Sequence, residues 1–160
     1  MKDRIVIRQE RPDQPEVMAL LDDLDHYLGS LYEPEANHLL DVQALLAPEL
    51  SFFVARDGQQ AIATGALRRM QGQADTDGLP YGEIKRMYVD PARRGERLAA
   101  RVLAVLEDTL RGEGYRHALL ETGRAQSEAL RLYERCGYTP RGPFGGYPDN
   151  GLSVFYGKAL

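Results

Sequence analysis

The chain has 160 residues, of which 43% are hydrophobic and 28% charged, and its formal net charge is −4. This length suits one compact domain with a full hydrophobic core, and the composition is typical of a folded globular protein rather than a disordered one. The negative charge argues against a general nucleic-acid-binding surface, and the single cysteine excludes an internal disulfide. We therefore expect one domain spanning residues 1–160, without a nucleic-acid partner.

The hydropathy of the chain bears on its location in the cell. The first residues, MKDRIVIRQE, are charged and contain no apolar signal core. No apolar run approaches the length needed to cross a membrane. We therefore expect a cytoplasmic protein with no membrane partner.

The first fifty residues predict a strand, a helix and a less regular segment. The strand is expected over 4–8 (RIVIR), and the helix over 16–28 because its apolar residues form one stripe, with Gly29 placed to end it. Segment 30–50 is expected to hold a short helix bounded by Pro34 and Pro48. Polar and aromatic side chains crowd the start of this segment, which we interpret as a lip over a binding site: Tyr32, Glu33, Glu35, Asn37 and His38.

The middle of the chain predicts a β-hairpin, followed by a strand, a turn and a long helix. Residues 51–56 and 61–70 are expected to form two strands joined at Asp57-Gly58, and 72–80 a polar loop. Residues 82–89 (GEIKRMYV) are expected to form a strand that stops at Asp90-Pro91, because proline cannot donate to a sheet ladder. Helix 98–110 follows, with its apolar residues on one face.

The turn between that strand and that helix has the chemistry of an anion site. Gly95 lies just before the helix N-terminus, where backbone N–H groups lack acceptors and the helix dipole is positive. Arg93 and Arg94 stand beside it, and Arg97 and Arg101 follow. We expect these arginines to pair with phosphate groups; the alternative is a solvated helix face.

The last third of the chain predicts an α/β fold. Residues 117–121 (HALLE) form a short apolar run suited to a buried strand, and a right-handed crossover through helix 98–110 makes it parallel to strand 82–89. A helix over 127–135, a strand that starts at Tyr138-Thr139 and a last strand over 153–157 complete the chain. We expect a mixed, mostly antiparallel sheet with one central parallel pair and helices on both faces.

Five stretches of the chain resemble the GNAT family of acetyl-CoA-dependent N-acetyltransferases: YGEIKRMYV, DPARRGERLA, LLETG, EALRLYERCGY and PFGGYPDNGLSVFYGK, within a match that extends from Phe52 to Lys158. The family's turn motif, Q/R-x-x-G-x-G/A, falls on Arg94 to Ala99, with Arg97 in place of the middle glycine. The resemblance implies a GNAT-like fold in which the parallel strands splay apart, acetyl-CoA as co-substrate, and a primary amine as acceptor.

The resemblance also implies a set of cofactor-binding residues. The diphosphate is expected on the turn and first helical residues, and the thioester carbonyl and pantetheine arm on backbone N–H groups of strand 82–89. The expected residues are Met87, Tyr88, Val89, Arg94, Gly95, Glu96, Arg97, Leu98, Ala99 and Ala100. Arg97 brings a Cβ to a position where the motif has glycine, which restricts the turn, but its charge can pair with a phosphate.

Two residues are expected to move protons. An amine must lose a proton before it can attack a thioester, and Glu83 matches the position that many GNAT enzymes use as general base. Glu83 is expected to share a strand face with Lys85, Met87 and Val89. The alternative is a structural ion pair of Glu83 with Lys85, or with Arg68 or Arg69 on the neighbouring strand.

Tyr133 is the expected proton donor to the departing thiolate, because the stretch 129–138 (ALRLYERCGY) matches the family's A-L-x-L-Y-x-x-x-G-Y segment. Helical periodicity alone favours core packing for Tyr133. Cys136 has no histidine near it in sequence and is expected to pack rather than react. The three histidines show no metal-ligand spacing with each other or with Cys136, so no metal is expected.

The acceptor is expected to be a small amine or an amino-acid-like molecule. Acidic side chains on the lip would attract an ammonium group, and a strand lysine could hold a carboxylate. The expected substrate-binding residues are Tyr32, Glu33, His38 and Lys85. The alternatives are a GNAT-like module that senses acyl-CoA or another ligand without turnover, and a protein N-acetyltransferase. A monomer or a homodimer is expected.

Overall fold

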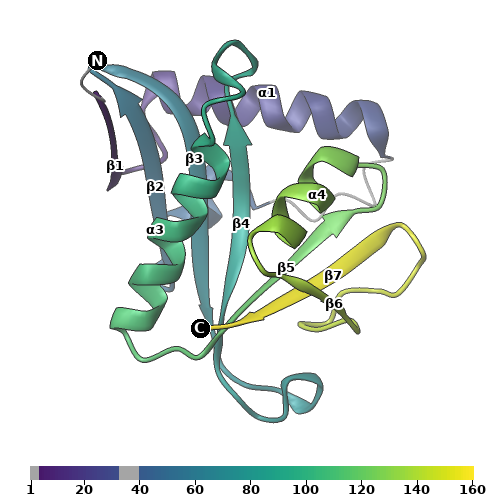
Figure 1. The fold of residues 1–160 in the computed structure, drawn as a ribbon. Helices are drawn as coiled ribbons and strands as arrows, with labels where there is room; N and C mark the ends of the chain where they lie inside the picture. The colour runs from purple at the N-terminus through teal and green to yellow at the C-terminus, as the bar shows by residue number, and fades with distance from the viewer. Residues whose placement is uncertain (1–3, 33–39) are drawn as a thin grey trace. The chain divides into compact units, whose positions relative to one another are not determined.

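The structure is a computed structural model that describes residues 4–32 and 40–160. Its strands join in one sheet in the order β1-β2-β3-β4-β5-β7-β6, in which β4 and β5 run parallel (Figure 1). The strands are β1 (Ile5–Gln9), β2 (Leu50–Asp57), β3 (Gln60–Met70), β4 (Tyr81–Val89), β5 (His117–Gly123), β6 (Thr139–Arg141) and β7 (Ser153–Ala159). The helices are α1 (Pro15–Leu31), α2 (Val42–Leu45), α3 (Leu98–Gly112) and α4 (Ser127–Arg135), with 3-10 turns η2 (Ala74–Thr76) and η3 (Pro91–Arg93).

The chain forms two compact units, each made of two stretches of sequence. The first unit holds Met1–Leu67 and Lys85–Leu106, and the second holds Arg68–Ile84 and Glu107–Leu160. Strands β3 and β4 and helix α3 each contribute residues to both units. The two units are described separately below.

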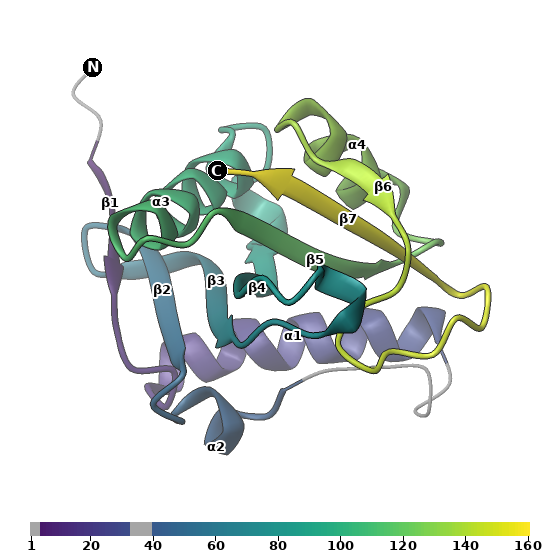
Figure 2. The same ribbon diagram turned by 90° about the horizontal axis from the view of Figure 1, so that it is seen from below.

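The core of the first unit lies between α1 and the strands. One stripe of α1 is buried together with Phe52 and Val54 of β2, and the stripe consists of Val17, Leu20, Leu21, Leu24 and Leu28. The first turns of α3 cover the opposite side of β3, where a Cβ added at Gly65 would come within 2.6 Å of Val102 Cγ1. Figures 1 and 2 show α1 running along one side of β2 and β3 and α3 along the other. Gly65 is therefore needed for the close approach of strand and helix.

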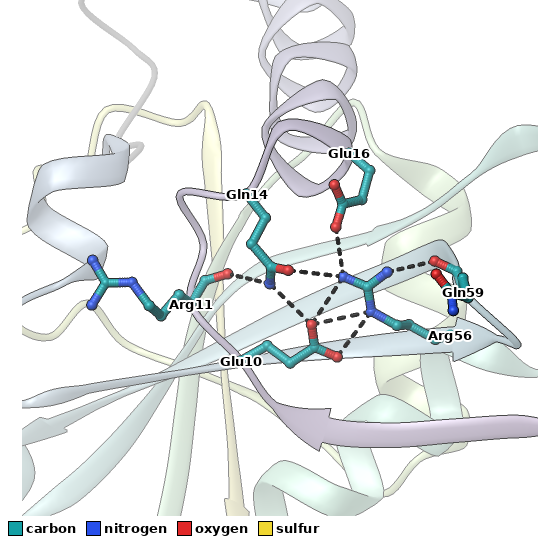
Figure 3. Close-up of polar contacts among 6 residues, drawn as sticks. All are labelled: Glu10, Arg11, Gln14, Glu16, Arg56 and Gln59. Atoms are coloured by element: carbon teal, nitrogen blue, oxygen red, sulfur yellow. Dashed lines mark hydrogen bonds and ion pairs between the residues drawn. The ribbon is translucent and has the colours of Figure 1, made fainter.

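An arginine ties β2 to the start of α1. Arg56 is paired with Glu10 through Nε and Nη2 at 3.0 Å each, and Nη2 also donates to Glu16 Oε1 at 2.8 Å and Gln14 Oε1 at 3.2 Å (Figure 3). Burial pushes the pKa of Glu10 up, but the hydrogen bonds from Arg56 and Gln14 outweigh it and leave that pKa below its ordinary value. The carboxylate of Glu16 also lies in the first helical turn, where negative charge is favourable.

The second unit is built on β5. Gly82 and Glu83 of β4 pair with Ala118 and Leu119 in parallel, while β7 pairs antiparallel with β5 on its other edge and with β6 beyond. The core includes Tyr81, Leu119, Phe144 and Phe155. A buried carboxylate, Glu107 of α3, accepts hydrogen bonds from Tyr138 Oη at 2.8 Å and from Lys158 Nζ at 2.9 Å.

The described structure confirms the predicted order of strands and helices and the hairpin at Asp57-Gly58. The predicted end of the first helix is wrong, because α1 does not end at Gly29 but continues to Leu31, and the Tyr32 N–H donates to Leu28 O at 3.0 Å. Helix α3 and strand β5 each extend two residues beyond their predicted ends. A helical glycine costs only about 1 kcal/mol relative to alanine, which the packing of the α1 stripe offsets. No helix among the described residues is long and apolar enough to cross a membrane.

Candidate active site

The turn that leads into α3 lies in the first unit and is open to solvent. Asp90 begins it by accepting a hydrogen bond from Ala92 N at 3.0 Å, and Gly95 has φ +91°, where an added Cβ would meet no atom within 4 Å. Arg94, Gly95, Glu96 and Arg97 are exposed, and Leu98 is the first buried residue. The first N–H groups of α3 have no acceptor within the helix and therefore face an accessible turn.

The arginines of this turn differ in whether they form ion pairs. Arg93 braces the turn, because it donates from Nε to Glu96 Oε2 at 2.8 Å and pairs through Nη2 with Asp57 Oδ2 at 3.0 Å. The side chains of Arg94 and Arg97 have no ion pair with any residue that the structure describes. The expectation that the arginines meet phosphate therefore fits Arg94 and Arg97 better than Arg93.

Arg97 takes the backbone conformation of the glycine that it replaces in the motif. Its φ is +58°, and its carbonyl oxygen accepts the Arg101 N–H at 3.0 Å, which is the first helical hydrogen bond at this end of α3. A left-handed backbone is unfavourable for a residue with a Cβ, by about 1 kcal/mol or more. The turn thus keeps its glycine-type path with an arginine in place, at a cost in strain.

A second left-handed arginine interrupts β4. Arg86 has φ +56°, and its carbonyl oxygen accepts a hydrogen bond from Thr64 Oγ1 at 2.8 Å. Its side chain is 2% exposed, pairs through both Nη atoms with the carboxylate of Asp25 on α1, and donates from Nε to Leu40 O at 3.0 Å. Neither the conformation nor this buried pairing was predicted from the sequence, since an arginine in a strand gives no sign of either.

The interruption at Arg86 corrects one expectation about β4. Gly82, next to Glu83, faces α3, and the Met87 side chain also lies on the α3 side, next to Gly65. Strict alternation would place Gly82 and Met87 on opposite faces. The left-handed residue shifts the period, so the expected common face of Glu83 and Met87 is wrong. Tyr88 is buried in the core cluster that contains α1.

Glu83 lies in the second unit, where it is held by a tyrosine. Glu83 is 2% exposed, and Tyr147 Oη donates to its Oε2 at 2.5 Å. Tyr147 is presented by a tight turn in which Gly145 and Gly146 have φ +64° and +79° and the Tyr147 N–H donates to Phe144 O at 3.2 Å, the pattern of a type I′ turn. The dipeptide Gly-Gly favours that turn, but its partner could not be predicted from sequence.

The aromatic rings around Tyr147 fix its orientation. The Phe144 ring lies edge-on to Tyr147 at 5.6 Å between centroids and to Phe155 at 5.8 Å, and Tyr147 and Phe155 are 6.2 Å apart. Burial raises the pKa of Tyr147 above its ordinary value, and the charge of Glu83 raises it further. The phenol is therefore a neutral hydrogen-bond donor to Glu83 at physiological pH.

The contacts of Arg68 and Arg69 on β3 bear on the alternative that Glu83 forms a structural ion pair with one of them. Arg69 donates to Glu113 from Nε at 2.6 Å and from Nη2 at 2.8 Å. Arg68 Nε is buried and has no hydrogen-bond acceptor among the described residues. Neither observation supports a structural ion pair of Glu83 with these arginines, and a pair with Lys85 stays a prediction.

Tyr133 lies on α4 and is 7% exposed. Its ring contacts Tyr138 edge-on at 5.9 Å and Tyr156 at 6.3 Å between centroids. Burial raises the pKa of Tyr133, with a smaller contribution from Cys136, so its hydroxyl is protonated at neutral pH. Both interpretations of Tyr133, proton donor and packing residue, are compatible with this position.

The other candidate residues are less informative. Glu33, Glu35, Asn37 and His38 lie outside the described residues, and Tyr32 packs partly buried against the core cluster of α1. Burial raises the pKa of the Cys136 thiol, which fits a packing role rather than a reactive thiolate. Within residues 4–32 and 40–160, no three His, Cys, Asp or Glu side chains gather as metal ligands.

Comparison with known proteins identifies the family. The model of the acetyltransferase (GNAT) family matches residues 17–138, and the chain is 43% identical over 156 residues to an "IAA acetyltransferase" of Azospirillum brasilense, covering 98% of both. The chain belongs to the GNAT acetyltransferase family.

Solved structures agree with this GNAT assignment. A candidate acyl-CoA N-acyltransferase from Klebsiella pneumoniae subsp. pneumoniae MGH 78578 is 32% identical with a TM-score of 0.76, covering 98% of this chain and 97% of that one. A GNAT family acetyltransferase from Elizabethkingia anophelis with acetyl-CoA bound has the same fold at 16% identity and a TM-score of 0.66, covering 99% and 100%. The expected α/β fold with a mixed sheet and a parallel β4–β5 pair is confirmed.

We expect Arg97→Gly to stabilise this GNAT protein slightly, by on the order of 0.5 kcal/mol, because relief of left-handed strain exceeds the added chain entropy of glycine. The matched control is Arg94→Gly, which removes the same charge at an extended residue with φ −71°. The control should lose stability by a similar amount. Urea unfolding of the three proteins measures this, and equal effects of the two changes would contradict the assigned strain.

Tyr147→Phe should lower the free energy of unfolding at neutral pH by about 1–3 kcal/mol, because a buried carboxylate loses its donor. The pKa of Tyr147 is raised on folding, so its stabilising contribution is complete below the unfolded value of about 10 and is lost as pH rises through the folded value. The variant should therefore lose stability less steeply than wild type above about pH 10. Urea unfolding across that range measures the slopes, with Tyr27→Phe, an exposed tyrosine, as the control. Parallel slopes in all three proteins would contradict this role of Tyr147.

Proposed function

We propose that this GNAT acetyltransferase transfers the acetyl group of acetyl-CoA to the primary amine of a small molecule, by direct attack in a ternary complex, and that residues 1–160 act as a single domain. The observation that carries the proposal is the exposed turn before α3. It combines the first N–H groups of α3, which have no acceptor within the helix, with two arginines that have no ion pair among the described residues.

The turn suits the diphosphate of acetyl-CoA. Gly95 leaves the backbone open, Arg97 keeps the left-handed path of the motif glycine, and the N-terminus of α3 is positive. Arg94 and Arg97 can each pair with a phosphate oxygen. The backbone N–H groups of Met87 to Val89 and of Leu98 to Ala100 are proposed to hold the rest of the cofactor. When bound, acetyl-CoA supplies an activated acetyl group as a thioester.

Glu83 is proposed to accept the proton that the acceptor's ammonium must lose. A lysine-like amine has a pKa of about 10.4 and is protonated at neutral pH, so a nearby carboxylate that receives the proton through water makes the nitrogen nucleophilic. The Tyr147 hydroxyl donates to Oε2. This hydrogen bond orients the carboxylate that is proposed to receive the proton.

Tyr133 is proposed to give a proton to the sulfur as the carbon–sulfur bond breaks. Its raised pKa keeps the hydroxyl protonated until it is needed. A proton donor to the leaving group stabilises the transition state more than the ground state. The nitrogen thus loses a first proton to Glu83 before it attacks and a second one as the carbon–sulfur bond breaks. Tyr133 gives its proton to the departing sulfur, and the second nitrogen proton restores the phenol, so that the net product is the amide, CoA thiol and one proton on Glu83.

A small-molecule acceptor is supported by the relationship to the "IAA acetyltransferase" of Azospirillum brasilense rather than by any bound ligand. A thiol-release assay with acetyl-CoA and a panel of small amines and peptides tests the proposal, together with calorimetry of acetyl-CoA binding at low and high salt. We expect turnover of small amines and weaker binding at high salt. Absence of acetyl-CoA binding, or turnover of polypeptides alone, would overturn it.

Tyr133→Phe should lower kcat by about a hundredfold, the usual size of proton-transfer assistance, with little change in acetyl-CoA affinity. Tyr156→Phe is the control, because it removes a hydroxyl from a ring that contacts Tyr133 and is hydrogen-bonded instead to Glu134. Steady-state and single-turnover rates measure the effect. Similar losses in both variants would assign Tyr133 to packing.

A further inference from the structure

Arg68 of β3 lies on the same face of the second unit as the candidate base. Side chains two residues apart in a strand share a face, so Arg68 goes with Met70 on β3, and Tyr81 goes with Glu83 on β4. Met70 packs against the core cluster that contains Tyr81. The two pairs therefore line one face of the sheet.

Arg69 on β3 and Gly82 on β4 face the opposite side of the sheet, toward α3. Gly82 approaches Leu110 of α3, with 2.3 Å between a Cβ added at Gly82 and Leu110 Cδ2. Arg69 reaches Glu113, just beyond the end of α3, with a two-pronged ion pair. Arg68 and Arg69 are adjacent in sequence and lie on opposite faces of the sheet. Arg69 lies on the face covered by α3, and Arg68 lies on the face that carries Glu83.

The charges of Arg68 and Glu83 act on the same two phenols. Burial and the charge of Glu83 raise the pKa of Tyr81 to about 12, while the charge of Arg68 opposes the rise. The same opposing effects of Glu83 and Arg68 act on Tyr147, whose hydroxyl is bonded to Glu83. A guanidinium and a carboxylate thus share one aromatic environment.

The side chain of Arg68 is half-buried in this environment, and its Nε lacks a hydrogen-bond partner among the described residues. Its Nε is covered from solvent, and no acceptor of any described residue lies within hydrogen-bond distance of it. The buried Tyr81 hydroxyl likewise has no partner among these residues. Unsatisfied buried donors are costly, and a planar carboxylate matches the guanidinium edge in a bidentate pair.

We propose that Arg68 binds a carboxylate of the acceptor while Glu83 receives the proton from its amine, so that the enzyme selects amino-acid-like acceptors that carry both groups. The inference rests on the proposed function and names its substrate class. The acceptor's two charges are matched by opposite charges on one face of the second unit: its ammonium by Glu83 and its carboxylate by Arg68.

The experiment compares acceptors that differ only in the carboxylate: an amino acid, its amide and the corresponding decarboxylated amine. Arg68→Gln should reduce kcat/KM for the amino acid about ten- to hundredfold more than for the decarboxylated amine, mainly through KM. For the amino acid, the kcat/KM of Arg68→Lys should lie between those of wild type and Arg68→Gln, because lysine keeps the positive charge but cannot form a bidentate pair with a carboxylate. Arg69→Gln, which removes the adjacent arginine on the other face, should affect all three acceptors equally.

The outcomes separate this inference from the proposed function. Wild-type turnover that does not favour the carboxylate-bearing acceptor overturns the role of Arg68 and leaves the acetyltransferase intact. Equal losses for all acceptors in Arg68→Gln, with an unchanged unfolding temperature, also overturn it. Absence of thiol release from every acceptor, with acetyl-CoA bound or not, overturns the proposed function itself.

Discussion

The second unit is arranged around one requirement, which is that the buried carboxylate of Glu83 must have a hydrogen-bond donor. Without a donor such a group is costly to bury, and it would tend to take up a proton instead. Tyr147 meets the requirement because a two-glycine turn aims it and Phe144 and Phe155 fix its ring. The segment between β6 and β7 therefore positions the Tyr147 hydroxyl next to Glu83 on β4.

In the first unit, two arginines have backbone conformations that favour glycine. Arg97 is the last residue of the turn into α3. Arg86 interrupts β4 and is held by contacts with Thr64, Asp25 and Leu40. Strain of this kind persists only where surrounding contacts impose it, and it gathers at functional positions. Arg97 lies in the turn that is proposed to hold the diphosphate, and Arg86 directly precedes the β4 residues whose backbone is proposed to contact the cofactor. The strain at both positions therefore shapes the backbone at or next to the proposed cofactor contacts.

The sequence predicted the parts of the fold that rest on local pattern. The stripe of α1, the Asp57-Gly58 hairpin and the helix Ser127–Arg135 follow from periodicity and turn chemistry, and the structure has all three. Periodicity could not reveal Arg86, because a left-handed residue in a strand is imposed by contacts far away in sequence. For the same reason the partners of Glu83 and Glu107 were missed: Tyr147, Tyr138 and Lys158 come from distant segments, and no local signal pairs them.

The ionisation of the phenols decides how charge is distributed over the candidate site. Tyr81, Tyr133 and Tyr147 all have raised pKa values, because burial disfavours the phenolate in each. They are therefore neutral throughout the physiological range, and they can donate hydrogen bonds or a proton without adding charge. The charged groups that act on Tyr81 and Tyr147 then include Glu83 and Arg68, together with Asp75, Glu121 and Arg141. A carboxylate that accepts a proton from an ammonium becomes neutral, so Arg68 loses one nearby negative charge during transfer, and a negative group on the acceptor would replace it. Charge balance during the reaction thus favours the same zwitterionic acceptor as the unpaired Nε of Arg68.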